Sequence, residues 1–64
     1  MKITIIALFM VTYPACGDAI YDVIRAPFTS YQACEEYRMD YQRMRGPAPA
    51  GSVYKCEERE IVVN

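Results

Sequence analysis

Hydrophobic and polar positions divide the chain into segments with different periods. Residues 3 to 11 carry no charge and are mainly apolar, and residues 18 to 26 are rich in β-branched and aromatic side chains. Residues 52 to 61 alternate, with Tyr54 and Cys56 on one side and charged residues on the other. Alternation predicts a half-exposed strand, and β-branched runs that end at turn residues also predict strands. The pattern therefore predicts strands over 18 to 26 and over 52 to 61.

Between these two strands, residues 30 to 45 follow a helical period. Four side chains recur at spacings of three, four and three residues, which places them on one stripe of a helix. We expect that stripe to face the sheet. Its members are Cys34, Tyr37, Tyr41 and Met44.

Both ends of this helix carry recognisable signals. Thr29, with Gln32 three residues later, fits a capping box, and Phe28 is placed to pack back on Ala33 as a hydrophobic staple. At the other end Gly46 is followed directly by proline, a combination that terminates helices. The helix is therefore expected to end at about residue 45.

The cysteines predict a covalent link between helix and strand. The chain has three Cys and no His. Cys34 lies on the helix stripe and Cys56 on the uncharged side of the last strand, so both should point inward. We predict a disulfide between them, which closes a loop and contributes about 3 kcal/mol. Two buried free thiols are the alternative, whereas cysteines so widely spaced, without His, lack the usual spacing of zinc ligands.

The N-terminal segment has the pattern of a secretory signal peptide. Lys2 precedes the apolar run, and a proline and several small residues follow it. The run is too short for a transmembrane helix, which needs about 20 residues. Cleavage after Gly17 or Ala19 would also remove Cys16 and leave an even pair of cysteines. The expected division is residues 1–17 as signal peptide and residues 18–64 as one small β-α-β domain.

Other interpretations of this segment stay open. An acylated Cys16 would make the protein a lipoprotein, although Tyr13 and Pro14 stand where that signal needs an aliphatic and a small residue. An uncleaved membrane anchor is another alternative.

The main alternative is that residues 2 to 13 form a retained strand. It would be apolar on both faces, as suits a strand buried on both sides, and a chain this short is expected to cover both faces only as a dimer. A hairpin through residues 14 to 18 would extend the fold to β-β-α-β, and a cytoplasmic location would follow. Either way the class is α+β, with one helix packed on a short sheet. One face would carry Ile3, Ile5, Phe9 and Val11, and the other Ile6, Leu8 and Met10.

Composition removes several function classes. A net charge of −1, from 7 basic and 8 acidic residues, does not favour nucleic-acid binding. Without His the chain lacks the commonest general base and metal ligand. Its carboxylate clusters, at residues 35 to 36 and 57 to 60, point in different directions. We therefore expect a non-enzymatic protein with no catalytic residue, no cofactor and no metal.

A candidate partner-binding surface lies on the helix. Arg38, Arg43 and Arg45 interleave with two tyrosines, and both residue types are favoured at interface hot spots. A solvated helix face is the alternative, since Glu35 and Arg38 have the spacing of an ordinary i, i+3 ion pair.

A resemblance can be drawn from the segments around the two paired cysteines. Residues 27 to 30 read Pro-Phe-Thr-Ser before Cys34, and Tyr54-x-Cys56 stands in the closing strand. With the apolar N-terminus, this arrangement resembles small bacterial and prophage proteins grouped in domain-of-unknown-function families. The resemblance covers most of the chain and implies no known active site. Cys16 and the tyrosine-rich helix depart from that pattern.

These observations lead to two expectations for function. The first is a small exported protein, periplasmic or secreted, that binds a macromolecular partner, with membrane contact only through its N-terminal segment. The second is a cytosolic or membrane-associated prophage accessory protein that forms a homodimer through residues 2 to 13.

Overall fold

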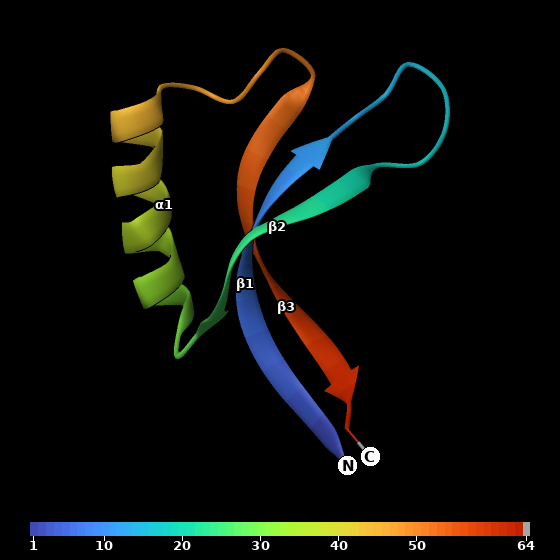
Figure 1. Cartoon of the computed structure of the whole chain (residues 1–64), viewed down its shortest axis with the longest axis vertical. Coiled ribbons are helices and arrows are strands. Elements are labelled where there is room, and N and C mark those ends of the chain that lie inside the picture. The colour runs from blue at the N-terminus through green and yellow to red at the C-terminus, as the bar shows by residue number, and fades with distance from the viewer. Residues whose placement is uncertain (64) are drawn as a thin grey trace.

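A computed structural model of the chain, described over residues 1–63, contains three strands and one helix (Figure 1). The elements follow the order β1 (Lys2–Thr12), β2 (Ile20–Phe28), α1 (Tyr31–Arg45) and β3 (Ser52–Val62). The strands form one antiparallel sheet with the spatial order β2-β1-β3. The predicted α+β class is confirmed, in the β-β-α-β form.

β1 is the central strand of the sheet. It pairs with β2 on one side from Ile6 to Thr12 and with β3 on the other from Lys2 to Thr12. The uninterrupted apolar run of β1 is explained by this position, because a central strand has neighbours at both edges and side chains to bury on both faces. A chain cut after residue 17 would lack the strand that joins β2 to β3. The division into a leader and a mature domain stays a prediction.

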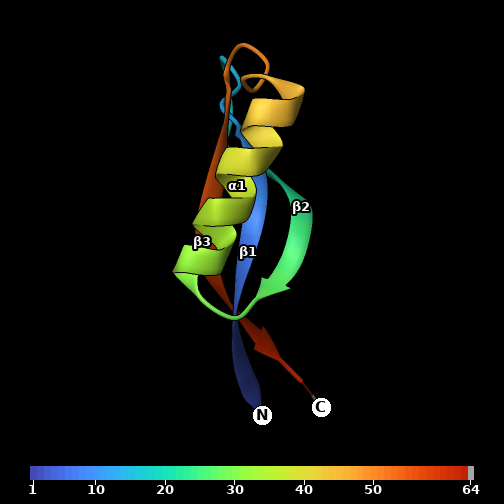
Figure 2. The ribbon, with the colours of Figure 1, turned by 90° about the vertical axis from the view of Figure 1, so that its left-hand side faces the viewer.

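One face of the sheet packs against the helix (Figure 2). Leu8 of β1, Cys34 of α1 and Cys56 of β3 are buried together at its centre. The side chains that surround this group are Ile6, Ile24, Phe28, Tyr37 and Tyr54.

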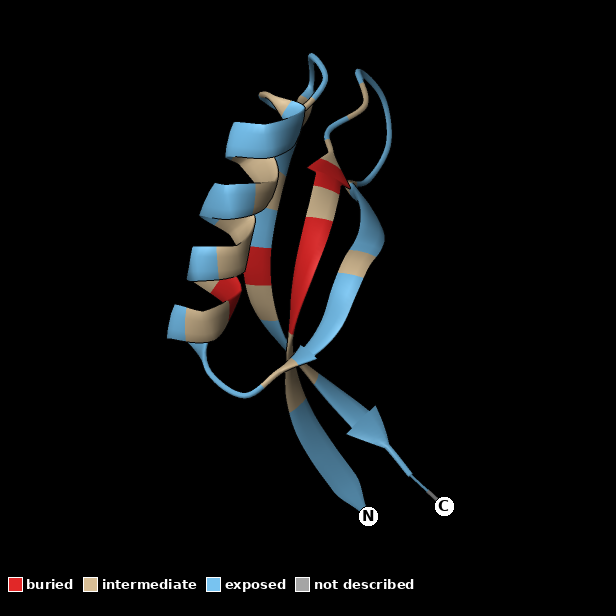
Figure 3. Cartoon of the chain, turned by 60° about the vertical axis from the view of Figure 1, so that its left-hand side comes forward, coloured by how far each residue is buried: buried red, intermediate tan, exposed pale blue. Residues whose placement is uncertain are grey.

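The opposite face of the sheet has its own small core. Ala7, Phe9 and Val11 of β1 are buried there, with Ala19 packed against them. Figure 3 shows buried segments along β1, although no helix of the described residues 1–63 covers this side. The two-sided pattern read from the sequence is therefore confirmed. These three residues are buried within a single chain, and dimerisation stays a prediction.

β2 continues two residues beyond the predicted strand. It was expected to end before Pro27, whereas the strand runs through Pro27 to Phe28, with a cis Ala26–Pro27 peptide bond. β2 pairs with β1 alone. Proline is tolerated in such an edge strand because one side of its backbone needs no ladder partner.

The helix is capped one residue later than predicted. Ser30, not Thr29, is the N-cap, and its hydroxyl accepts a hydrogen bond of 3.1 Å from the backbone N–H of Ala33. Ser30 has the extended backbone that an N-cap requires, with φ −155° and ψ 161°. At the other end Gly46 adopts φ 83° and terminates the helix as predicted.

The predicted helix stripe is correct at three positions and wrong at the fourth. Cys34 is buried and the two tyrosines are half-buried, but Met44 is 85% exposed. Met44 stands in the last turn of α1, and its exposure shows that the stripe is not buried at this end of the helix.

Candidate functional site

One flank of α1, between its buried stripe and its exposed side, carries an open hollow of about 370 Å³. Two of the three predicted arginines line it, Arg38 and Arg43. They are joined by the exposed Met39, and the turn after Gly46 brings in Pro47. The remaining lining residue is Gln42. This face thus combines cationic, amide and apolar groups around one depression.

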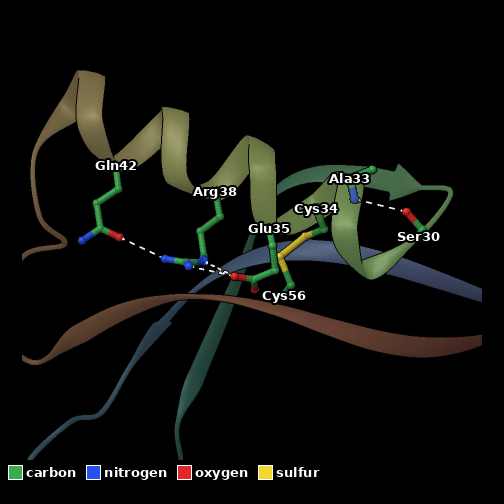
Figure 4. The surroundings of a disulfide bond; sticks show 7 residues. All are labelled: Ser30, Ala33, Cys34, Glu35, Arg38, Gln42 and Cys56. Carbon is green, nitrogen blue, oxygen red and sulfur yellow. Dashed lines mark hydrogen bonds and ion pairs between the residues drawn. A yellow bond between two sulfur atoms is a disulfide. The ribbon is translucent and has the colours of Figure 1, made fainter.

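Arg38 is held in place by its own helix (Figure 4). Its Nε and one terminal nitrogen donate to Glu35 Oε2 at 3.0 and 2.7 Å. Its other terminal nitrogen donates to Gln42 Oε1 at 3.3 Å. The ion pair anticipated from the i, i+3 spacing is confirmed, and Gln42 completes a chain of three polar side chains along the helix.

The other two arginines behave differently. Arg43 pairs with Asp40, and both side chains are largely exposed, at 77% and 62%. Arg45 places its guanidinium carbon 4.9 Å from the centroid of the Tyr41 ring. The structure therefore brings Arg38 and Arg43 together at the hollow, while Arg45 stacks on Tyr41 instead of lining it.

The predicted disulfide lies beneath the same helix. Cys34 and Cys56 are bonded with a Cα–Cα distance of 6.1 Å, inside the limit of about 7 Å that a disulfide requires. Figure 4 shows the bond between the first turns of α1 and strand β3. Cys16 is free and exposed in the loop between β1 and β2. The covalent link fixes the helix, and with it the hollow, relative to the sheet.

Glu57 of β3 is engaged in ion pairs on the other face of the sheet. Glu57 lies 2.6 Å from Arg59 and 3.3 Å from Lys55. Burial raises the pKa of Glu57, but hydrogen bonds from Arg59 and Lys55 outweigh it and leave the pKa below its ordinary value. The pKa of Lys55 is raised, first by its hydrogen bond to Glu57. A carboxyl with a lowered pKa is a weak base, so this cluster is suited to ion pairing and not to proton transfer.

Sequence reasoning missed an aromatic cluster on that same face. Arg59 lies over two rings, 4.8 Å from the centroid of Phe9 and 4.9 Å from that of Tyr21. The two rings meet edge to face at 5.5 Å. The alternation of β3 did place Arg59 on the outer side, but only the strand order shows that Phe9 and Tyr21 lie beside it.

Neither a metal centre nor a membrane span is found over residues 1–63. No group of three His, Cys, Asp or Glu side chains gathers there with the geometry of a metal site. The single helix of this described region is not long and apolar enough to cross a membrane.

The comparisons with known proteins add no assignment. No protein-family model, no curated protein and no solved structure matches the chain. The resemblance to small prophage proteins therefore stays a prediction, and the site has to be interpreted from its geometry.

Proposed function

We propose that this protein is a small non-enzymatic binding protein that recognises an acidic segment of a protein partner through the flank of α1 that carries the hollow. The observation that carries the proposal is the hollow in which Arg38 and Arg43 lie beside the exposed Met39. Arginine and methionine are enriched in the cores of protein interfaces, whereas Lys and Glu are depleted there.

The ion pairs of this face leave its arginines available. An exposed pair contributes only about 0 to 1 kcal/mol, so a carboxylate of a partner can replace Asp40 beside Arg43 at small cost. Arg38 has two neighbours, Glu35 and Gln42, and is the less exposed of the two arginines. Arg43 is therefore the residue on which an acidic partner should depend most.

The disulfide supports a location outside the reducing cytosol. Disulfides persist in oxidising compartments such as the periplasm or the extracellular space, and the Cys34–Cys56 bond is compatible with export. We propose that the partner is met in the periplasm or envelope.

A charge-reversal experiment tests the helix face. Arg43→Glu should weaken binding to an immobilised acidic peptide and to the partner captured from envelope extract, because the change opposes the charge of the ligand. Lys55→Glu makes the same kind of change on the opposite face of the sheet and is the matched control. Binding should fall with added salt, since rim charges act mainly on the encounter rate. Equal binding by the two variants would remove the helix face from consideration.

A second candidate, the accessory protein that keeps residues 1–17, is favoured by one observation. β1 stands between β2 and β3 and supplies Leu8 to the core under the helix. The intact mass of the natural protein decides between the forms. Loss of 17 or 19 N-terminal residues would support a cleaved leader, whereas an intact N-terminus would support a structural β1. A loss of two hydrogens would report the disulfide in either form.

A further inference from the structure

The ends of β1 and β3 extend beyond the rest of the fold as a two-stranded ribbon (Figures 1 and 3). Residues 2 to 5 of β1 pair with residues 59 to 62 of β3, but β2 pairs with β1 only from Ile6 onward. Within this ribbon Ile3 is 39% exposed and Ile61 is 44% exposed. A two-stranded ribbon without further packing is at best marginally stable in water. The ribbon therefore has the properties of an incomplete sheet.

The hydrogen bonds between Met1 and Val63, at the end of the ribbon, show which backbone groups of β1 face β3 and which face the free edge. The amino group of Met1 donates to the carbonyl of Val63 at 3.0 Å, and the N–H of Val63 donates to the carbonyl of Met1 at 2.7 Å. Antiparallel ladders alternate between hydrogen-bonded and non-hydrogen-bonded pairs. Ile3 therefore also directs its backbone groups toward β3, whereas Lys2 and Thr4 direct theirs to the other edge. No strand within residues 1–63 lies along that edge beside Lys2 and Thr4.

We propose that a second copy of the chain completes this edge, with the two β1 strands paired antiparallel about a two-fold axis at Ile3. In this register Lys2 lies opposite Thr4 of the second copy, and Thr4 lies opposite Lys2 of the second copy. Both N–H groups and both C=O groups that each copy directs to the edge then have partners. The result is a four-stranded β3-β1-β1-β3 sheet across the axis, and β2 continues along the same edge of each β1.

The side chains favour a second copy over a foreign strand because the edge is self-complementary. Ile3 meets Ile3 of the second copy at the axis, and Met1 meets Ile5, so apolar side chains oppose each other on one face. On the other face Lys2 opposes Thr4, which avoids the penalty of like charges directly opposite. The charge of Lys2 is already balanced within its own ribbon by Glu60, at 3.3 Å.

The remaining sheet edges are protected against such pairing. Charged side chains and proline on an edge strand discourage association. The outer edge strand β3 carries five charged residues between Lys55 and Glu60, and the outer edge strand β2 contains Pro27. The short free edge of β1 has only the ion-paired Lys2.

The chain exposes more surface than a folded monomer of its mass usually does. The chain exposes 4760 Å², whereas monomeric folded proteins of 7.3 kDa expose about 4,200 Å² by mass scaling. The excess of about 600 Å² is comparable with the roughly 800 Å² that each partner contributes to a standard interface.

The inference rests on the second candidate function, because it requires that β1 be retained in the folded protein. It does not involve the flank of α1 that carries the hollow.

Self-association of the full chain tests the inference first. The apparent mass should rise with concentration from 7.3 kDa toward twice that value in sedimentation or light-scattering measurements. Thr4→Pro should stay at the monomer mass over the same dilution series, because it removes an N–H that faces the free edge and none that pairs with β3. Thr4→Val keeps the N–H and should associate like the wild type. A melting temperature measured at high dilution shows that the proline variant is folded.

A cross-linking experiment tests the register. In a Cys16→Ser background, Ile3→Cys should form a disulfide-linked dimer on oxidation, because residues at the axis lie about 4.5 Å apart in a non-hydrogen-bonded pair. Thr4→Cys should not, because its two copies would lie farther apart than the limit of about 7 Å. Three outcomes would each overturn the proposal. The wild-type chain could stay monomeric, the dimer could survive Thr4→Pro, or a cross-link could form at Thr4→Cys but not at Ile3→Cys. None of these outcomes affects partner binding by α1, which is tested with Arg43→Glu.

Discussion

The guanidinium of Arg59 lies 4.8 Å from the centroid of the Phe9 ring, on the face of the sheet that α1 leaves uncovered. The same group lies 4.9 Å from the ring of Tyr21 and donates to Glu57 at 2.6 Å. Phe9 is only 5% exposed, although no second layer of structure within residues 1–63 covers it. Arginine is suited to this role because its planar group is weakly hydrated and stacks on aromatic faces.

Replacement of Arg59 should therefore destabilise the fold more than replacement of an ordinary surface arginine. Arg59→Ala is expected to lower the free energy of unfolding by about 1 to 2 kcal/mol, since each cation–π contact contributes about 0.5 to 2 kcal/mol according to its exposure. Arg59→Lys keeps the charge but loses the planar stacking, so an intermediate value is expected. Urea unfolding measures both. Arg43→Ala is the control and should lower the free energy of unfolding by under about 0.5 kcal/mol. If Arg59→Ala lowered it by no more than this, the stacked guanidinium would have no stabilising role.

Loss of the disulfide should have a larger effect. The bond joins residues separated by 22 positions, and closure of such a loop restricts the unfolded chain by about 3 kcal/mol. Cys34→Ala combined with Cys56→Ala should therefore lower the melting temperature markedly, while the exposed Cys16→Ser should leave it unchanged. A double variant as stable as the wild type would show that packing under the helix suffices.

The tyrosines of α1 are expected to contribute to stability, but less than fully buried aromatic residues. Tyr37 packs on Phe28 with ring centroids 5.5 Å apart, and Tyr41 meets Tyr54 edge to face at 5.3 Å. Truncation of a buried aromatic residue costs about 3 to 5 kcal/mol. Both tyrosines are half-buried, so Tyr37→Ala and Tyr41→Ala should fall at or below the lower end of that range.

Thermal unfolding of these variants can be compared with that of Met44→Ala. Met44 lies on the same predicted stripe but is exposed, so its truncation should change the melting temperature little. If all three variants melted together, the assignment of the inner helix face would be incorrect.

The lowered pKa of Glu57 predicts a loss of stability in acid. Burial raises this pKa, but the hydrogen bonds from Arg59 and Lys55 lower it by a larger amount, so the net shift of the pKa is downward. The folded state then holds the proton less tightly than the unfolded state. The contribution is present above the ordinary value of 4.5 and is lost as the pH falls through the folded pKa.

Urea unfolding at a series of pH values checks this dependence. Glu57→Gln should flatten the acid limb of the stability curve, because the amide does not titrate. Glu58→Gln, on the other side of the strand, should leave that limb as it is in the wild type. An acid limb unchanged by Glu57→Gln would assign the loss to other carboxylates.

The local elements could be predicted from the sequence because each depends on neighbours in the chain. The alternation of β3 was sufficient for a strand, and the spacing of Cys34, Tyr37 and Tyr41 for a helix face. The same two patterns turned both cysteines inward and so predicted their bond. The apolar run of β1 was not sufficient for a strand, because it also fits a signal peptide. Boundaries were less certain: the capping residue moved from Thr29 to Ser30, because both hydroxyl side chains suit an N-cap and only the backbone geometry distinguishes them.

The candidate binding surface was predictable in part. The three arginines were visible as a cluster on one helix, and the Glu35–Arg38 ion pair followed from helical spacing. The stacking of Arg45 on Tyr41 and the approach of Pro47 to the hollow depend on rotamers and on the path of the turn, which spacing does not determine.

The sequence by itself determined that β1 is apolar on both faces, but only the tertiary structure decided what covers them. Periodicity reports which sides of a strand are apolar, not which strands lie beside it. With β1 between β2 and β3, Leu8 meets the disulfide on one face, and Arg59 and Tyr21 enclose Phe9 on the other. Strand order depends on contacts between residues far apart in the chain, so the roles of Arg59 and of the free edge at Thr4 emerge only from the assembled sheet.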